Sequence, residues 1–300
     1  MNNNSPPGLI TFSIGSIALS LIPQDRSIHL EIPNTHKPFL STTSPDINIY
    51  VRHEPEFDID LDKLIFETGG NWLIGLLEEK IIIKTGLAEN KIHRVLTLEQ
   101  DLTSADLVCV GDMWLRSKNN IFPLGYPLDM LLVALTLVKQ HGELFHAAAI
   151  EHRGRGILFV GNSGAGKSTI SRLWKEVEGT TLLSDDRIII RRTNGFYRIY
   201  GTPWHGDAQV FSQQSASLDC IFILNHAPRN HIVQIEPIDA IVQLLACSFS
   251  TYWDAAGMKH DLQFLDELVL SVPCYELNFV PDSSIVDFIK RLDGNLENLQ

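Results

Sequence analysis

Residues 161–168, GNSGAGKS, have the composition and spacing of a loop that holds phosphate groups. Its glycines let backbone N–H groups turn inward around an anion, and a helix starting there would add a positive N-terminus. The amine of Lys167 could reach the β- and γ-phosphates, and the hydroxyl of Ser168 could bind Mg²⁺. The segment predicts nucleoside triphosphate binding, with ATP and Mg²⁺ as the expected cofactors. The residues expected around the nucleotide are Gly161, Asn162, Ser163, Gly164, Ala165, Gly166, Lys167, Ser168 and Thr169.

Two adjacent carboxylates, Asp185 and Asp186, follow an apolar run, and the first of them stands 17 positions after Ser168. An apolar strand that brings a carboxylate beside the strand of the phosphate loop is the usual second half of a Mg²⁺–nucleotide site. Two carboxylates allow a division of labour, in which one binds Mg²⁺ and the other accepts a proton from an attacking hydroxyl group. Without the loop upstream, the same residues would indicate only a polar turn at the end of a strand.

These residues need a strand before the loop and a helix after it, and the flanking sequence is typical of both. The apolar run GILFV at 156–160 predicts the strand, and residues 169–177 predict the helix. Strands and helices continue to alternate downstream, which indicates an α/β fold. Further strands are expected at 147–152, 180–186, 219–226 and 274–279, a hairpin at 187–201 with Asn194-Gly195 at its turn, and helices at 237–249, 261–272 and 281–292.

The chain before residue 120 differs, because it consists of short runs rich in Ile, Val and Leu between Pro, Gly, Asn and Ser residues. These runs lie at 9–22, 27–32, 47–53, 72–85, 93–99 and 105–111, and the fourth predicts a hairpin. We expect residues 1–120 to form a smaller β-rich N-terminal domain for packing or recognition, and residues 121–300 to form the catalytic domain. The second domain is expected to begin with a helix after Pro127 that ends near Gly142.

The composition and the N-terminal sequence argue against a nucleic-acid-binding, membrane-spanning or secreted protein. A net charge of −12, from 24 basic and 36 acidic residues, gives no support for a nucleic-acid partner. The longest apolar stretch, near residues 130–138, is far short of the roughly 20 residues of a membrane span. The start MNNNSPPG lacks the features of a signal peptide. The four cysteines are widely spaced and lie in or beside apolar runs, which indicates buried free thiols and a reducing cytoplasm.

Four segments in order, FHAAAIEHRGRGILFVGNSGAGKST, LLSDD, YGTPWHGD and VPCYELNFVPD, resemble the HPr serine kinase/phosphorylase superfamily. The resemblance covers residues 125–292. It is greater to the stand-alone HPr-kinase-like proteins found beside biosynthetic operons, including operons that modify peptides. The resemblance implies an α/β catalytic domain with the P-loop fold that HPr kinases share with phosphoenolpyruvate carboxykinases. The N-terminal part shows no motif of this superfamily.

The resemblance also implies roles for individual residues. His146 matches a histidine close to the nucleotide phosphates, although by itself it would more often indicate a core histidine. Asp185 matches the carboxylate that handles the proton of the acceptor, and Asp186 with Ser168 matches the metal-binding side. Three further residues could line the acceptor site or neutralise phosphate charge, with a turn or a surface strand position as the alternative: Arg187, His205 and Asp207.

Two features differ from the HPr kinases themselves. Asn162 stands where those enzymes carry an acidic residue, and their Glu-x-Arg-Gly-Leu-Gly signature is absent. The segment YGTPWHGDAQV occupies the corresponding stretch. We therefore do not assume HPr as the acceptor, or the reverse phosphorylase reaction.

The expected function is transfer of the γ-phosphoryl group of ATP to a hydroxyl group, such as a serine of a small protein or of a precursor peptide like that of a lasso peptide. A small-molecule hydroxyl is the alternative acceptor, and an ATP-binding regulator without transferase activity is the alternative function. A carboxykinase would be longer and need more basic residues. A GTPase would need an N-K-x-D motif where residues 223–228 read ILNHAP. The resemblance further suggests a homo-oligomer.

Overall fold

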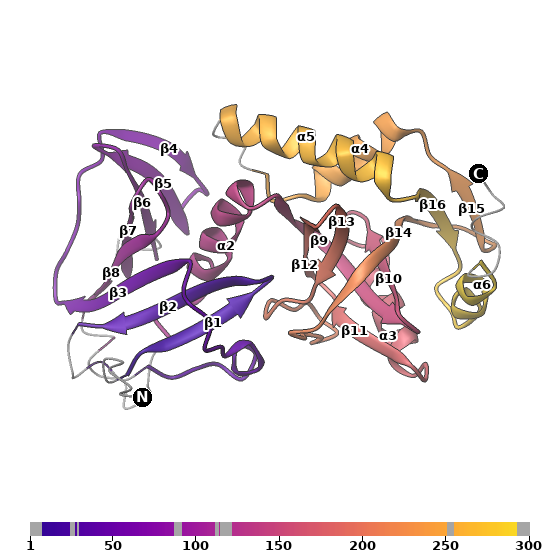
Figure 1. Ribbon diagram of the computed structural model, residues 1–300, viewed down its shortest axis with the longest axis horizontal. Helices are drawn as coiled ribbons and strands as arrows, with labels where there is room; N and C mark the ends of the chain where they lie inside the picture. Colours follow the sequence, from indigo (N-terminus) through magenta and orange to yellow (C-terminus); the bar gives the residue numbers. More distant parts are fainter. Residues whose placement is uncertain are drawn as a thin grey trace. The chain divides into compact units, whose positions relative to one another are not determined.

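The computed structural model describes residues 8–24, 28, 30–86, 92–111, 114, 122–250 and 255–292. Over these residues the chain is a mixed α/β protein built mostly from strands, which form two eight-stranded sheets (Figure 1). The chain divides into two compact units, Met1–Thr136 and Leu137–Gln300. The boundary expected at residue 120 lies outside the described residues, and the division between the units falls within helix α2 (Leu128–Lys139).

The first unit contains one mixed sheet with the strand order β1-β2-β3-β8-β7-β6-β5-β4. Its strands are β1 (Ile10–Ile14), β2 (Ile17–Pro23), β3 (Ile47–Glu54), β4 (Lys63–Glu67), β5 (Trp72–Leu77), β6 (Lys80–Thr85), β7 (Arg94–Leu98) and β8 (Ser104–Val110). Along β3, the side chains of Ile47, Ile49 and Val51 are fully buried and those between them are not, which is the two-residue period of a strand. The β-rich character and the hairpin of β5 and β6 are confirmed. Strand β4 was not predicted, and the run at 27–32 forms no strand in its described part.

A buried polar contact ties the segment between β2 and β3 to α2. The short 3₁₀ helix η1 (Lys37–Phe39) follows His36, whose Nε2 atom lies 3.0 Å from Oδ2 of Asp129 in the first turn of α2. Both side chains are buried, and burial of such polar groups is tolerated when they are paired in this way.

The second unit contains β9 (Gly142–His152), β10 (Arg155–Val160), β11 (Thr180–Ser184), β12 (Arg187–Thr193), β13 (Phe196–Tyr200), β14 (Ser215–His226), β15 (His231–Gln234) and β16 (Cys274–Phe279). β9 and β10 form the hairpin expected around Arg153-Gly154, and β12 and β13 form the hairpin expected around Asn194-Gly195. All four turn residues have positive φ, which is what a tight two-residue hairpin turn requires. Strand β15 was not predicted.

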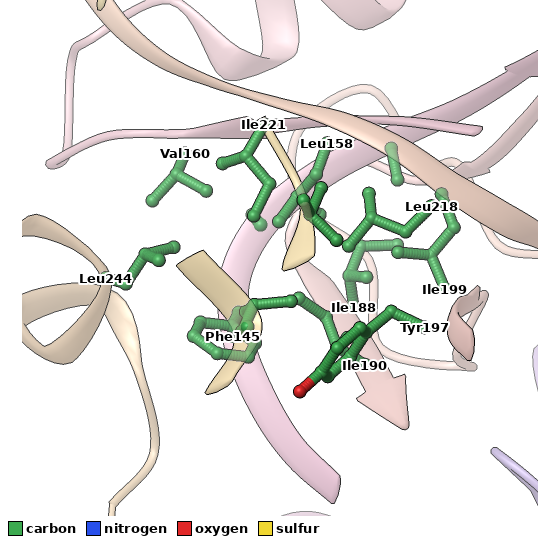
Figure 2. Packing of buried hydrophobic residues seen from close by; sticks show 14 of the residues in the cluster. Phe145, Leu158, Val160, Ile188, Ile190, Tyr197, Ile199, Leu218, Ile221 and Leu244 are labelled. Atoms are coloured by element: carbon green, nitrogen blue, oxygen red, sulfur yellow. The ribbon is translucent and has the colours of Figure 1, made fainter. Parts of the chain in front are cut away.

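Five strands of this sheet form a closed ring of pairings. Each of β10, β9, β12, β13 and β14 pairs with the next, and β14 returns to pair in parallel with β10. β14 makes both contacts because it is long: residues 215–217 pair with β13, and residues 218–223 pair with β10. One hydrophobic cluster draws buried residues from all five strands, as Figure 2 shows for Phe145, Leu158, Ile188, Ile199 and Ile221.

Helices contribute side chains to the hydrophobic clusters on both faces of this sheet. They are α3 (Lys167–Lys175), α4 (Pro237–Cys247), α5 (Ala255–Ser271) and α6 (Ser284–Leu292). α4 and α5 add residues such as Leu244 and Phe264 to the cluster of Figure 2, whereas α3 and α6 add residues such as Trp174 to a second cluster. Adjacent residues of β9, Ala147 and Ala148, belong to different clusters, because successive strand residues point to opposite faces. Within the described part of the chain, no helix is long and apolar enough to cross a bilayer.

Candidate functional site

The glycine-rich loop 161–168 connects β10 to α3, so the strand and the helix expected on its two sides are both present. Gly164 and Gly166 have φ angles of 84° and 102°, which residues with side chains rarely adopt. A Cβ atom on Gly166 would also lie 2.6 Å from Cζ of Phe279 at the end of β16. The loop backbone therefore reaches β16 only because residue 166 has no side chain.

Lys167, the first residue of α3, turns its side chain back to the loop. Its Nζ atom donates hydrogen bonds to the carbonyl oxygens of Gly161, at 2.6 Å, and of Asn162, at 3.2 Å. The residue is only 6% exposed. Burial lowers the pKa of Lys167, and the charge of Asp186 acts in the opposite direction. An anion bound in the loop would supply this amine with a counter-charge that two carbonyl dipoles provide only in part.

The acidic pair lies between β11 and β12, and both of these strands pair with β9. We expected the strand carrying the pair to lie directly beside β10, and this was wrong, since β9 lies between them. The reason is the length of β9, which forms a hairpin with β10 along one edge and offers its other edge to β11 and β12. The same pairing puts Arg187 opposite His146, so β9 itself brings the histidine to the acids.

Asp185 is 1% exposed and uses its carboxylate to hold the segment 206–210. Oδ1 accepts hydrogen bonds from the backbone N–H groups of Gly206, at 3.0 Å, and Val210, at 3.2 Å. Oδ2 accepts a third from Ala208 at 2.7 Å. A carboxylate offers about four acceptor positions, so one is left for a further donor.

Asp186 lies between two basic side chains. Its Oδ1 atom is 3.0 Å from Nε2 of His146, and its Oδ2 atom is 2.5 Å from a guanidinium nitrogen of Arg187. The same guanidinium group lies over the ring of Phe249, 4.5 Å from its centroid. Burial raises the pKa of Asp186, but the hydrogen bond from His146 and the charge of Arg187 outweigh burial and leave it below its ordinary value. The Asp186 side chain is therefore a carboxylate at neutral pH.

One open cleft of roughly 320 Å³ joins the loop to the acidic pair. Of the residues singled out in the sequence, it is lined by His146, Ser163, Gly164, Gly166, Lys167, Ser168, Thr169, Asp185, Asp186 and Asp207. Those that do not line it, among the described residues, are Gly161, Asn162, Ala165, Arg187 and His205. Arg187 acts on the cleft only through Asp186, whereas His205 is exposed, with its Nδ1 atom 3.0 Å from the carbonyl oxygen of Gly206.

Two parts of the site had not been singled out from the sequence. The first is Gly206, which lines the cleft beside Asp207 and donates its N–H to Asp185. The second is His226, whose Nε2 atom lies 3.1 Å from the carbonyl oxygen of Gly164. The sequence signal for His226 is its position at the carboxyl end of a buried strand, which is where ligands bind in α/β sheets.

The segment 120–281 matches the family described as SynChlorMet cassette protein ScmC. The match spans more than half of the chain and includes the glycine-rich loop, the acidic pair and the segment 206–210. The chain belongs to this family.

No curated protein matches the chain. Among solved structures, the HPr(Ser) kinase/phosphatase from Coxiella burnetii is similar over 52% of this chain and 99% of that one, with 14% identity and a TM-score of 0.31. Because both values are low, we base the fold on the strand pairings of this chain alone.

Proposed function

We propose that this protein is an ATP-dependent kinase that transfers the γ-phosphoryl group to a hydroxyl group. The observation that carries the proposal is one cleft that places Lys167, Ser168, Asp185 and Asp186 around a common space. The backbone of a glycine-rich loop at a helix start, together with an ammonium group, suits the phosphates of a nucleotide, and carboxylates suit an acceptor hydroxyl and a metal ion. Phosphoryl transfer needs little from a protein beyond such positioning and charge.

In this proposal the backbone of residues 161–169 surrounds the phosphates, and Lys167 exchanges its loop carbonyls for phosphate oxygens. The acceptor position left on Asp185 takes up the proton of the attacking hydroxyl, as a positioned base does. His146 keeps Asp186 oriented through the contact between Nε2 and Oδ1. Arg187 adds positive charge behind Asp186. Asp207, which lines the cleft, and His205, which is exposed two residues before it, would contact the acceptor.

A magnesium ion would fit this site through Ser168 and Asp186, which line the same cleft with a hydroxyl and a carboxylate. Within the described residues, no cluster of three or more His, Cys, Asp or Glu side chains could hold a metal ion by itself. Mg²⁺ is usually bound by one or two side-chain oxygens together with water and substrate phosphates, so the small set of side chains is suitable. When bound, the ion would neutralise charge on the phosphates.

The acceptor proposed first is a serine of a small protein or of a precursor peptide, and a small-molecule hydroxyl is the alternative. The family is described as a cassette protein, which supports testing first the peptides and metabolites made by neighbouring genes. The proposed setting is the cytoplasm, where ATP is available.

The test is to incubate the purified protein with Mg²⁺, γ-labelled ATP and these candidate acceptors, and to identify products by mass spectrometry. We expect phosphorylation of one acceptor, and its loss in Asp185→Asn with nucleotide binding largely intact. Because Asp185 also holds the segment 206–210, Ser184→Ala is the control for disturbance of the surrounding backbone. It removes the 3.1 Å hydrogen bond from Ser184 to the Trp204 carbonyl and the two 3.3 Å bonds that Oγ of Ser184 accepts from the N–H groups of Asp186 and Arg187, but it changes neither carboxylate group.

Full transfer activity in Asp185→Asn would show that Asp185 is not the base. Equal loss of activity in Asp185→Asn and Ser184→Ala would show that disturbance of the backbone around the acidic pair explains the loss, and that the base assignment to Asp185 is not supported. If ATP binds and changes the affinity for a partner, with no label transferred to any acceptor, the protein is a nucleotide-dependent regulator and the kinase proposal is wrong.

A further inference from the structure

The strand before the glycine-rich loop has different neighbours on its two edges. β10 pairs with β9 on one edge and with β14 on the other. β9 and the strands beyond it provide His146, Asp185 and Asp186. β14 runs parallel to β10, so the carboxyl ends of both strands reach the same edge of the sheet. His226, the last residue of β14, therefore lies beside the loop on the side away from the acids.

His226 contacts the loop, and its ring packs against a second aromatic ring. Its Nε2 atom lies 3.1 Å from the carbonyl oxygen of Gly164, a residue that lines the cleft. Its ring centroid is 5.2 Å from that of Phe279, with 32° between the two planes. Phe279 is fully buried, whereas His226 is exposed. The open part of the imidazole is consequently the part away from Phe279, and the ring lies next to Gly164, which lines the cleft.

Hydrogen bonds hold the backbone next to both rings in place. The N–H of Ala227 donates to the carbonyl oxygen of Phe279 at 3.0 Å. In the turn after β14, Asn230 accepts a hydrogen bond from the N–H of Val280 at 2.7 Å and donates one to Oγ of Ser284 at 2.7 Å. The turn is thereby fixed both to the end of β16 and to the start of α6. A ring held in this way loses little freedom when a flat ligand stacks on it.

We propose that the exposed imidazole of His226 stacks against the purine base of the bound nucleotide. The inference rests on the proposed nucleotide binding and specifies where the base lies. With the reacting phosphate directed at Asp185 and Asp186, the nucleoside end is placed on the β14 side of the loop, away from the part of the cleft that His146, Gly206 and Asp207 line together with the acids. Aromatic stacking accepts any base but favours the larger purine face, so ATP and GTP should both bind better than UTP.

The experiment compares binding of ATP, UTP and inorganic tripolyphosphate to the full chain by titration calorimetry. Tripolyphosphate occupies the loop but has no base, so the ratio of ATP affinity to tripolyphosphate affinity isolates the contribution of the base. We expect His226→Ala to reduce this ratio about ten-fold or more and to abolish the preference for ATP over UTP. His226→Phe should restore both, because it keeps a ring while removing the hydrogen bond to Gly164.

The matched control is His53→Ala in the first unit. It removes a bond of the same kind, 3.1 Å from Nε2 to the carbonyl oxygen of Gly111, and should leave the ratio unchanged. An unchanged ratio in His226→Ala, or tripolyphosphate binding as tightly as ATP to the unsubstituted chain, would overturn the stacking inference while leaving phosphate binding intact. Absence of binding for all three probes would overturn the proposed function and this inference together.

Discussion

His146 and Asp186 are 40 positions apart in the chain, and their side chains meet with 3.0 Å between Nε2 and Oδ1. The contact links the hairpin of β9 and β10 to the junction between β11 and β12. The second oxygen of Asp186 is taken by Arg187, so the carboxylate is held on both sides. A cation that binds to Asp186 must therefore share it with two basic groups that are already in place.

The first prediction concerns Asp186→Asn. The pKa of Asp186 in the folded chain lies below its ordinary value. The carboxylate therefore stabilises the fold fully at pH values above the pKa that Asp186 has in the unfolded chain. This stabilisation is lost as the pH falls through the pKa of Asp186 in the folded chain. We expect Asp186→Asn to lower the free energy of unfolding by about 1 kcal/mol at pH 6, with the deficit shrinking toward pH 3. Urea unfolding followed by tryptophan fluorescence would measure it, and a deficit that does not change with pH would contradict the prediction.

The second prediction separates two effects of a side chain at position 166. Gly166→Ala should be destabilised by positive φ and also by the Phe279 ring, 2.6 Å from the new Cβ atom. Gly154→Ala is the control, since Gly154 also has positive φ but no atom within 4 Å of the new Cβ. We expect a loss of about 1 kcal/mol for Gly154→Ala and about 1–3 kcal/mol more for Gly166→Ala, measured by thermal unfolding. Equal losses would show that the Phe279 ring moves aside freely.

The third prediction concerns a buried pair of acids away from the cleft. Burial, and then the neighbouring carboxyl of Asp261, raise the pKa of Glu143 well above its ordinary value. The folded chain therefore keeps a proton that the unfolded chain releases above about pH 4.5, and stability falls as the pH rises above that value. Glu143→Gln should remove this loss of stability. The unfolding midpoint of the variant, relative to that of the unsubstituted chain, should therefore rise between pH 5 and pH 8.

The exposed Glu178→Gln serves as the control for the third prediction, because Glu178 lies at the surface after α3. It measures the effect of the same Glu→Gln change at an exposed position. A Glu143→Gln curve parallel to that of the unsubstituted chain would show that Glu143 is ionised in the folded protein.

The fourth prediction concerns the thiols. Cys109, Cys220 and Cys247 are buried and Cys274 is half-buried, and all four are free, which confirms the expectation from their apolar surroundings. Burial raises the pKa of Cys109 and of Cys274 to about 12 and also raises that of Cys247. The thiolate is the reactive form, so we expect a disulfide reagent at pH 8 to modify fewer than one thiol per folded chain within minutes and all four in guanidinium.

A Glu178→Cys variant calibrates this measurement, since it adds one thiol at an exposed position. It should give one rapid equivalent above the background. Rapid reaction of a native cysteine would show that the fold opens around that residue on the time scale of the experiment.

Local sequence was sufficient for the elements whose signals lie within a few residues. The turns at Arg153-Gly154 and Asn194-Gly195 were predicted because positive φ depends on the residue itself and on its nearest neighbours. The helix after the glycine-rich loop and the strand before it were likewise predicted from short-range hydrophobic spacing. Strands β4 and β15, which are short and partly exposed, have no comparable signal and were missed.

The arrangement of the site depends on pairings between distant segments, which no local pattern encodes. Sequence could propose Asp185 as a base, but only the fold shows that segment 206–210 already occupies three of its acceptor positions. Sequence placed the acid-bearing strand beside β10, but β9 lies between them, since it pairs with β10 along one edge and with β11 and β12 along the other. His226 reaches Gly164 only because β14 pairs in parallel with β10. The chemistry of each residue could thus be predicted from the sequence. Contacts between strands could not, because they follow from the pairing register, which is set by the packing of the whole sheet.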